Sequence, residues 1–151
     1  MRLCNNAISV ITETIPKGST ILELGSGFGT EELISMGYKV ISIEQDPEWQ
    51  GRYHSNYINA PIKKYKDYWW YDSDYLQNLP SYDFLLIDGP TGPPTKEYDN
   101  CRVGFLDHKN LFNLSVPILV DDTNRFDEKI LARRLMVDRD FTDYGNFILI
   151  H

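Results

Sequence analysis

Residues 21–30, ILELGSGFGT, form a short apolar run that passes through an acidic residue into a glycine-rich turn. Three glycines alternate in it, at positions 25, 27 and 29. Glycine lets the backbone approach a ligand closely or adopt a positive φ angle. The dinucleotide-binding fingerprint Gly-x-Gly-x-x-Gly needs its third glycine one position later, where this chain has Thr30. The stretch therefore predicts a strand and a turn around a nucleotide-like ligand that has no pyrophosphate.

A second apolar run, residues 39–46 (KVISIEQD), fits a buried parallel strand that ends in Glu44. Glu44 lies 19 residues after Gly25. In a β-α-β unit this spacing puts a carboxylate at the tip of the second strand, where it can accept hydrogen bonds from both hydroxyls of a ribose. The spacing indicates a nucleoside ligand but does not say which one.

Together the two segments resemble the class I S-adenosylmethionine (SAM)-dependent methyltransferases, whose motif I reads acidic-x-Gly-x-Gly-x-Gly, with Glu23 as the acidic member. The resemblance implies SAM as cofactor, with the turn around its methionine part and Glu44 on its ribose. It also implies that Gln45 neighbours the adenine and that Asn59 meets the adenine amine. The cofactor-binding residues that it implies are Glu23, Leu24, Gly25, Ser26, Gly27, Gly29, Thr30, Glu44, Gln45, Asn59, Ala60 and Asp88.

Composition agrees with one small α/β enzyme domain over residues 1–151. Hydrophobic residues make up 42% of the chain and charged residues 25%, which is ordinary for a globular protein. The net charge of −7 opposes attraction to a phosphate backbone, so we expect no nucleic-acid partner. The basic cluster Lys63, Lys64 and Lys66 lies among aromatic residues, which more often cover a core or shape a pocket than stack on bases.

Cysteine content and hydropathy predict a cytoplasmic protein without a membrane segment. Cys4 and Cys101 are too few and too far apart for a disulfide framework or a zinc site. No stretch approaches the roughly 18 apolar residues of a membrane span.

The pattern of apolar residues predicts an α/β fold: a Rossmann-like, seven-stranded, mostly parallel sheet with helices on both faces and a C-terminal antiparallel hairpin. Strands are expected at 19–24, 39–44, 56–60, 82–88, 116–121, 141–144 and 147–150. Helices are expected at 3–15, 29–36, from 46–47 onward, at 72–79 within an otherwise irregular 61–81 segment, at 102–113, and from a cap at 122–124 to about 137. A loop is expected at 89–94.

Polar residues end each predicted parallel strand. They are Glu23, Glu44, Asn59, Asp88 and Asp121. In an open α/β sheet, ligands bind beyond the carboxyl ends of the strands, so we expect these side chains to converge on one site.

Asp88 and the pair Asp121 and Asp122 are the candidate residues for catalysis, either as metal ligands or without a metal. They resemble the metal ligands of catechol-type O-methyltransferases, in which an Asp-Asn pair takes the place of the last two. Oxygen-rich acidic clusters suit hard divalent cations. The alternative, which we favour slightly, uses Asp88 as a metal-free base or substrate clamp and Asp122 as a helix N-cap or substrate contact.

The segment IDGP at 87–90, with the later Arg102 and Arg125, resembles a group of small bacterial and viral methyltransferases, some tied to polysaccharide modification. The resemblance implies O-methylation of a small molecule or glycan, with Arg102, Asp122 and Arg125 as substrate contacts. Few residues precede the first predicted strand, so acceptor contacts would come from residues 61–81, from residues 89–101 or from another subunit of a homo-oligomer.

Two other functional classes remain open. A non-catalytic module that binds SAM or another nucleoside would have the same acidic strand ends. An NAD-dependent oxidoreductase would need a hydride-site group such as Tyr-x-x-x-Lys, yet Tyr98 and Tyr144 have no lysine four residues later.

Overall fold

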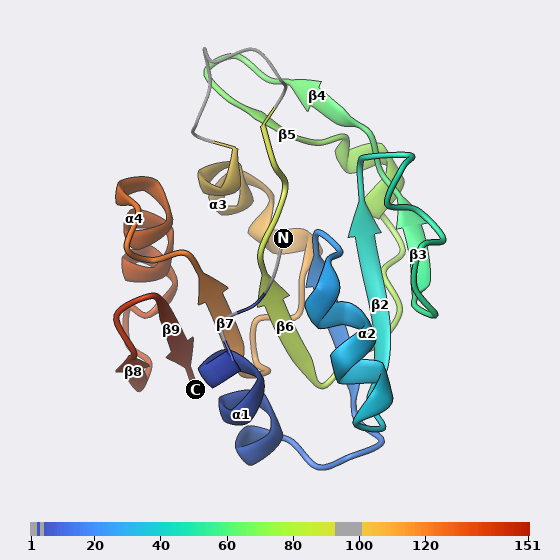
Figure 1. Cartoon of the computed structure of the whole chain (residues 1–151). Coiled ribbons are helices and arrows are strands. Elements are labelled where there is room, and N and C mark those ends of the chain that lie inside the picture. Colours follow the sequence, from blue (N-terminus) through green and yellow to red (C-terminus); the bar gives the residue numbers. More distant parts are fainter. Residues whose placement is uncertain (1–2, 4, 93–100) are drawn as a thin grey trace.

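A computed structural model describes residues 3, 5–92 and 101–151 (Figure 1). Cys4, Tyr98 and the last two residues of the predicted 89–94 loop lie outside the described residues.

Seven strands form the main sheet, as the sequence predicted. Its order is β3-β2-β1-β6-β7-β9-β8, with β9 antiparallel to both of its neighbours. The strands are β1 (Thr20–Leu24), β2 (Lys39–Glu44), β3 (Asn56–Asn59), β6 (Phe84–Ile87), β7 (Ile118–Asp121), β8 (Phe141–Asp143) and β9 (Phe147–Ile150). The chain turns in opposite directions from β1, toward β2 on one side and β6 on the other, so the loops after these strands meet at one edge.

Helices cover both faces of this sheet (Figure 1). The helices α1 (Asn5–Thr14) and α2 (Phe28–Ser35) lie on one face, and α3 (Phe105–His108) and α4 (Phe126–Leu135) lie on the other. Alternate residues of β1 enter different cores, because Ile21 packs with the first pair of helices and Leu22 with the second. Burial on both faces explains why β1, β2, β6 and β7 are rich in apolar residues, whereas β3 at the edge of the sheet is only partly buried.

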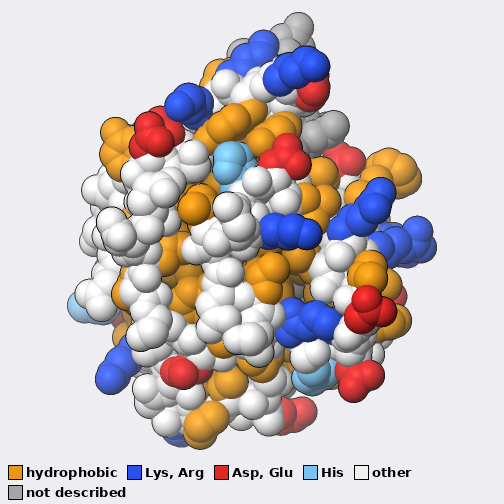
Figure 2. Space-filling model, turned by 180° about the vertical axis from the view of Figure 1, so that it is seen from behind, with side chains coloured by type: hydrophobic (Ala, Val, Ile, Leu, Met, Phe, Trp, Pro, Cys, Tyr) orange, Lys and Arg blue, Asp and Glu red, His pale blue; other side chains and the backbone are white. Residues whose placement is uncertain are grey.

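Residues 61–81 are more regular than predicted. A two-stranded antiparallel hairpin joins β4 (Ile62–Lys64) to β5 (Trp69–Tyr71). The predicted 72–79 helix is a single 3-10 turn, η1 (Ser73–Leu76), capped by the side chain of Asp72. Figure 2 views the second face, on which Lys and Arg side chains lie at the upper end and along the right-hand side.

Two further predicted helices are wrong or broken. The segment after Asp46 is a series of turns, because the Asp46 carboxylate accepts the Glu48 amide and offers the backbone an alternative to a helix. The predicted 102–113 helix divides into η2 (Arg102–Gly104), α3 and η3 (Lys109–Leu111). No described helix is long and apolar enough to cross a bilayer.

The predicted cap of the following helix at residues 122–124 is also wrong. Arg125 is the N-cap of α4, and Asp122 lies in a turn before it with a φ of 59°. The Asp122 carbonyl accepts the Arg125 amide at 2.8 Å. Aspartate tolerates this left-handed conformation better than most residues, and its carboxylate is left to make ion pairs instead of a cap.

Candidate functional site

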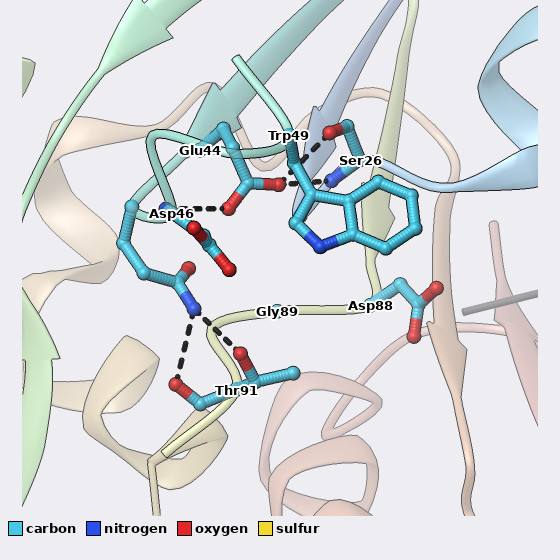
Figure 3. A pocket seen from close by; sticks show the side chains of 9 residues that line it. Ser26, Glu44, Asp46, Trp49, Asp88, Gly89 and Thr91 are labelled. Carbon is cyan, nitrogen blue, oxygen red and sulfur yellow. Dashed lines mark hydrogen bonds between the residues drawn. The ribbon is translucent and has the colours of Figure 1, made fainter. Parts of the chain in front are cut away.

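A pocket of about 200 Å³ opens at the carboxyl ends of β1, β2 and β6. Figure 3 shows Glu44, Trp49 and Ser26 on one side of it and the segment from Asp88 to Thr91 on the other. The residues that line it are Gly25, Ser26, Glu44, Gln45, Asp46, Trp49, Asp88, Gly89 and Thr91. Five predicted cofactor-binding residues are among them: Gly25, Ser26, Glu44, Gln45 and Asp88.

Two glycines bring the strand-end loops together at the base of this pocket. Gly25 has a φ of +84°, and its amide donates to the carbonyl of Ile43 at 2.8 Å. A Cβ atom on Gly89 would lie 2.9 Å from the Gly25 nitrogen, closer than real side chains come to backbone. The loops after β1 and β6 therefore pack backbone against backbone, which leaves room for a ligand above them.

Glu44 is only 3% exposed, and both of its carboxylate oxygens are held. One accepts hydrogen bonds from the amide and hydroxyl of Ser26 at 2.8 and 2.9 Å, and the other accepts from the Asp46 amide at 2.9 Å. The carboxylate is thus fixed at the end of β2, on the wall of the pocket. Fixed acceptors of this kind suit a pair of ligand hydroxyls.

Gln45 links the segment after β2 to the loop after β6. Its side-chain nitrogen donates to the carbonyl and hydroxyl oxygens of Thr91 at 3.2 and 2.6 Å. Its amide oxygen is buried without a hydrogen-bond partner. Because a buried acceptor without a donor is costly, the pocket fits a ligand that brings an N–H or O–H group to this place.

Trp49 contributes an aromatic wall that the sequence analysis missed. Its ring lies 6.3 Å from each of the rings of Phe28 and Tyr53, and the Arg52 guanidinium lies 4.5 Å from its centroid. A lone tryptophan in a turn carries no positional signal in the sequence. Only the fold reveals that it faces Ser26 and Glu44.

Glu23 lies behind the pocket. It is 2% exposed and accepts hydrogen bonds from the hydroxyls of Thr30, at 2.7 Å, and Ser42. Burial raises the pKa of Glu23 to about 8, against the lowering effect of these two hydroxyls. The acidic member of the glycine motif therefore ties β1 to α2 and β2 as a largely neutral acid at pH 7.

Replacing Glu23 by glutamine is expected to flatten the pH dependence of stability. The pKa of Glu23 is raised from 4.5 to about 8 on folding, so the wild type should lose stability as pH rises between these values. The loss should reach about 1.4 kcal/mol per pH unit within that window. Urea unfolding at pH 5 and pH 8 measures it. The exposed Glu13→Gln control should keep the wild-type slope, and an equally steep Glu23→Gln variant would refute the assignment.

Asp88 forms the other end of the site and is paired with a buried arginine. The Arg102 Nη2 atom lies 2.9 Å from Asp88 Oδ1 and 3.1 Å from Asp122 Oδ2. The Arg102 Nε atom lies 3.8 Å from Glu128 Oε1. The Arg102 side chain is 3% exposed, so a contact with substrate would be made through the acids around it.

Two of these acids, with Asp121, form the one group of possible metal ligands among the described residues. Asp88, Asp121 and Asp122 offer carboxylate oxygens within 4.8 Å of one another. These oxygens suit a hard cation, but two of the three carboxylates already pair with Arg102. The donor set therefore fits a metal only if the guanidinium moves.

Burial raises the pKa of Asp88 to about 7, with Arg102 opposing the rise and Asp121 and Asp122 adding to it. Burial likewise raises the pKa of Asp121 and of Glu128. A carboxyl group with a pKa near neutrality can both accept and release a proton under physiological conditions.

Several predicted residues lie away from the pocket lining. Leu24 and Ala60 are buried in the core, and Asn59 is exposed at the end of β3. Gly27 is the N-cap of α2, where its amide donates to the Thr30 hydroxyl. Gly29 packs on the N-terminal segment, since a Cβ there would lie 2.6 Å from the Leu3 side chain.

Arg125 lies at the rim of the acidic group. Its Nη1 atom is 3.1 Å from Asp122 Oδ2 and 3.9 Å from Glu128 Oε1, and its side chain is 56% exposed. Glu128 was missed, although its spacing of three residues from Arg125 on a helix could have indicated the contact.

Comparison with known proteins gives matches in structure alone. No protein-family model matches the sequence, and no curated protein matches it either. A TehB-like SAM-dependent methyltransferase from Corynebacterium glutamicum is similar over 94% of this chain and 83% of its own, with 13% identity and a TM-score of 0.54.

Two further structures are similar. MycE, a methyltransferase of the mycinamycin biosynthetic pathway solved with Mg, SAH and mycinamycin VI, matches 97% of this chain and 44% of its own, at 10% identity and a TM-score of 0.57. The magnesium protoporphyrin IX methyltransferase ChlM from Synechocystis, solved with SAM, matches 96% and 74%, at 13% identity and a TM-score of 0.52. The chain thus has the fold of these SAM-dependent methyltransferases.

Proposed function

We propose that this chain is a SAM-dependent methyltransferase. The observation that carries the proposal is the fixed Glu44 carboxylate at the end of β2, facing a pocket whose base is the close contact of Gly25 with Gly89. Glu44 would hold the ribose hydroxyls, and the unpartnered oxygen of Gln45 would accept the adenine amine. Bound SAM would supply a methyl group on a positively charged sulfur.

We propose further that the acceptor is a hydroxyl of a small molecule or glycan and that Asp88 takes its proton. Transfer forms the oxygen–carbon bond, breaks the carbon–sulfur bond and releases one proton from the acceptor. Asp88 lines the pocket and has a pKa near 7, which suits a general base. Arg102 would hold the Asp88 carboxylate in place and stabilise its charged form.

Arg125 and Asp122 are proposed to contact the acceptor from the rim, where Arg125 is exposed. Phe126, which is 78% exposed beside Arg125, adds an apolar surface at this rim.

The ion pair of Arg102 with Asp88 and Asp122 supports a metal-free reaction over the alternative in which Asp88, Asp121 and Asp122 hold a divalent cation.

Titration calorimetry with S-adenosylhomocysteine (SAH) and NAD tests the cofactor. The wild type should bind SAH, and Glu44→Ala should weaken binding by about 1.5 to 3 kcal/mol, because charge-assisted hydrogen bonds to the ribose are lost. Glu48→Ala, which removes an exposed carboxylate from the next loop, is the matched control and should leave SAH affinity unchanged.

Unchanged SAH affinity in Glu44→Ala would place the ribose elsewhere, and preference for NAD would overturn the proposal. Methyl transfer from SAM to a panel of hydroxyl acceptors then separates an enzyme from a binding module. SAH binding without turnover on any acceptor would favour the module.

A further inference from the structure

Tyr71 lies beneath the pocket although it belongs to the hairpin outside the main sheet. It is the last residue of β5, is fully buried and is absent from the pocket lining. Its hydroxyl donates to the carbonyl of Ile43 at 3.2 Å. The same carbonyl accepts the Gly25 amide at 2.8 Å, so one acceptor on β2 holds both the turn after β1 and the hairpin.

The Tyr71 hydroxyl also abuts the loop after β6. A Cβ atom on Gly89 would lie 2.6 Å from this oxygen. Burial raises the pKa of Tyr71 well above its ordinary value, so the hydroxyl keeps its proton and remains a donor. A single buried hydroxyl therefore touches the ends of β2 and β6 and shares an acceptor with the turn after β1.

The hairpin itself holds Tyr71 in place. The Tyr65 hydroxyl donates to the Tyr71 carbonyl at 3.2 Å and accepts the Ser73 amide at 3.1 Å. The Asp72 amide donates to the carbonyl of Pro61 at 2.8 Å. Bonds at the Tyr71 carbonyl and at the amides of the next two residues thus fix the backbone at the end of β5, so the Tyr71 ring has a defined position below the pocket.

We propose that Tyr71 is a positioning residue for the cofactor pocket: its hydroxyl sets the spacing between the Gly25 turn and the Gly89 loop. The inference rests on the proposed function, since the ligand of that pocket is taken to be SAM or SAH. It assigns the β4–β5 hairpin the role of a support for the two loops that approach the ligand.

The test removes one oxygen atom from each of two buried tyrosines. Tyr71→Phe is the test variant and Tyr82→Phe the matched control. The Tyr82 hydroxyl also bonds to a backbone carbonyl, that of Asn113 at 3.2 Å, but it lies away from the pocket lining. SAH affinity is measured by calorimetry and the melting temperature by calorimetric scanning. Hydrogen exchange is followed in peptides that cover residues 24–27 and 88–92.

We expect Tyr71→Phe to weaken SAH binding about three- to tenfold, the range of one hydrogen bond, and to speed exchange in both peptides. Tyr82→Phe should lower the melting temperature at least as much as Tyr71→Phe does, but it should change neither SAH affinity nor hydrogen exchange in the two peptides. Equal SAH affinity and equal exchange in the two variants would overturn the inference. A wild type that binds no SAH would refute the proposed function, and the exchange of ligand-free protein would then decide the role of Tyr71 alone.

Discussion

Replacing Arg102 by methionine is expected to lower the free energy of unfolding by about 3 to 5 kcal/mol, because it leaves buried acids without their cation. The Arg102 side chain is 3% exposed and pairs with Asp88 and Asp122. Urea unfolding at pH 7.5 measures the loss. Arg125→Met is the matched control, since that guanidinium meets Asp122 and Glu128 with 56% of its side chain exposed. It should cost about 1 kcal/mol or less.

The same pair of variants separates the metal-free site from the metal site. Without Arg102, the cluster of Asp88, Asp121 and Asp122 should recruit a hard cation, so Mg²⁺ or Ca²⁺ should raise the melting temperature of Arg102→Met. The wild type should show no such rise, and its methyl transfer should resist EDTA. Activity of the wild type that EDTA abolishes and Mg²⁺ restores would refute the metal-free version. An Arg102→Met variant as stable as Arg125→Met would refute the structural role of the buried pair.

The central strands β1, β2, β6 and β7 were predictable because they are buried on both faces of the sheet. Residues such as Leu22 and Ile43 sit in predominantly apolar runs, and the glycine after β1 marks where the chain turns. Turn chemistry was harder to predict. Asp46 and Asp122 lie where the start of a helix was expected. The Asp46 carboxylate instead accepts the Glu48 amide within a turn, and Asp122 adopts a left-handed backbone conformation. Short polar side chains offer several local hydrogen-bonding choices, and tertiary contacts decide among them.

The site was predictable where its residues follow strands and unpredictable where they come from elsewhere. Glu44 and Asp88 could be assigned because parallel strands end at one edge. Trp49 reaches the site from a turn, where its place in the sequence carries no signal, and Glu128 reaches it from a helix, where only its three-residue spacing from Arg125 could have indicated the contact. Glu23 shows a third outcome: the position in the motif was identified, and its carboxyl group is engaged by hydroxyls of the protein itself.

Gly89→Ala is expected to disrupt the site more than the addition of a methyl group at any other position. Its Cβ would lie 2.6 Å from the Tyr71 hydroxyl and 2.9 Å from both the Gly25 nitrogen and the Leu24 carbonyl carbon. Two of these contacts are backbone, so the loops after β1 and β6 must separate. We expect a loss of about 2 to 3 kcal/mol of stability, typical of overpacking, together with at least about tenfold weaker SAH binding.

Gly51→Ala is the control for the loss of a glycine alone. Gly51 has a φ of +74° and open space around it, so its replacement should cost about 1 kcal/mol of strain and leave SAH affinity unchanged. Combining Gly89→Ala with Tyr71→Phe should recover only part of the stability, because the hydroxyl contact is relieved while both backbone contacts remain. Full recovery of stability in the double variant would show that the clash with the Tyr71 hydroxyl alone causes the loss in Gly89→Ala. A Gly89→Ala protein with wild-type stability would show that they do not touch as closely as the geometry requires.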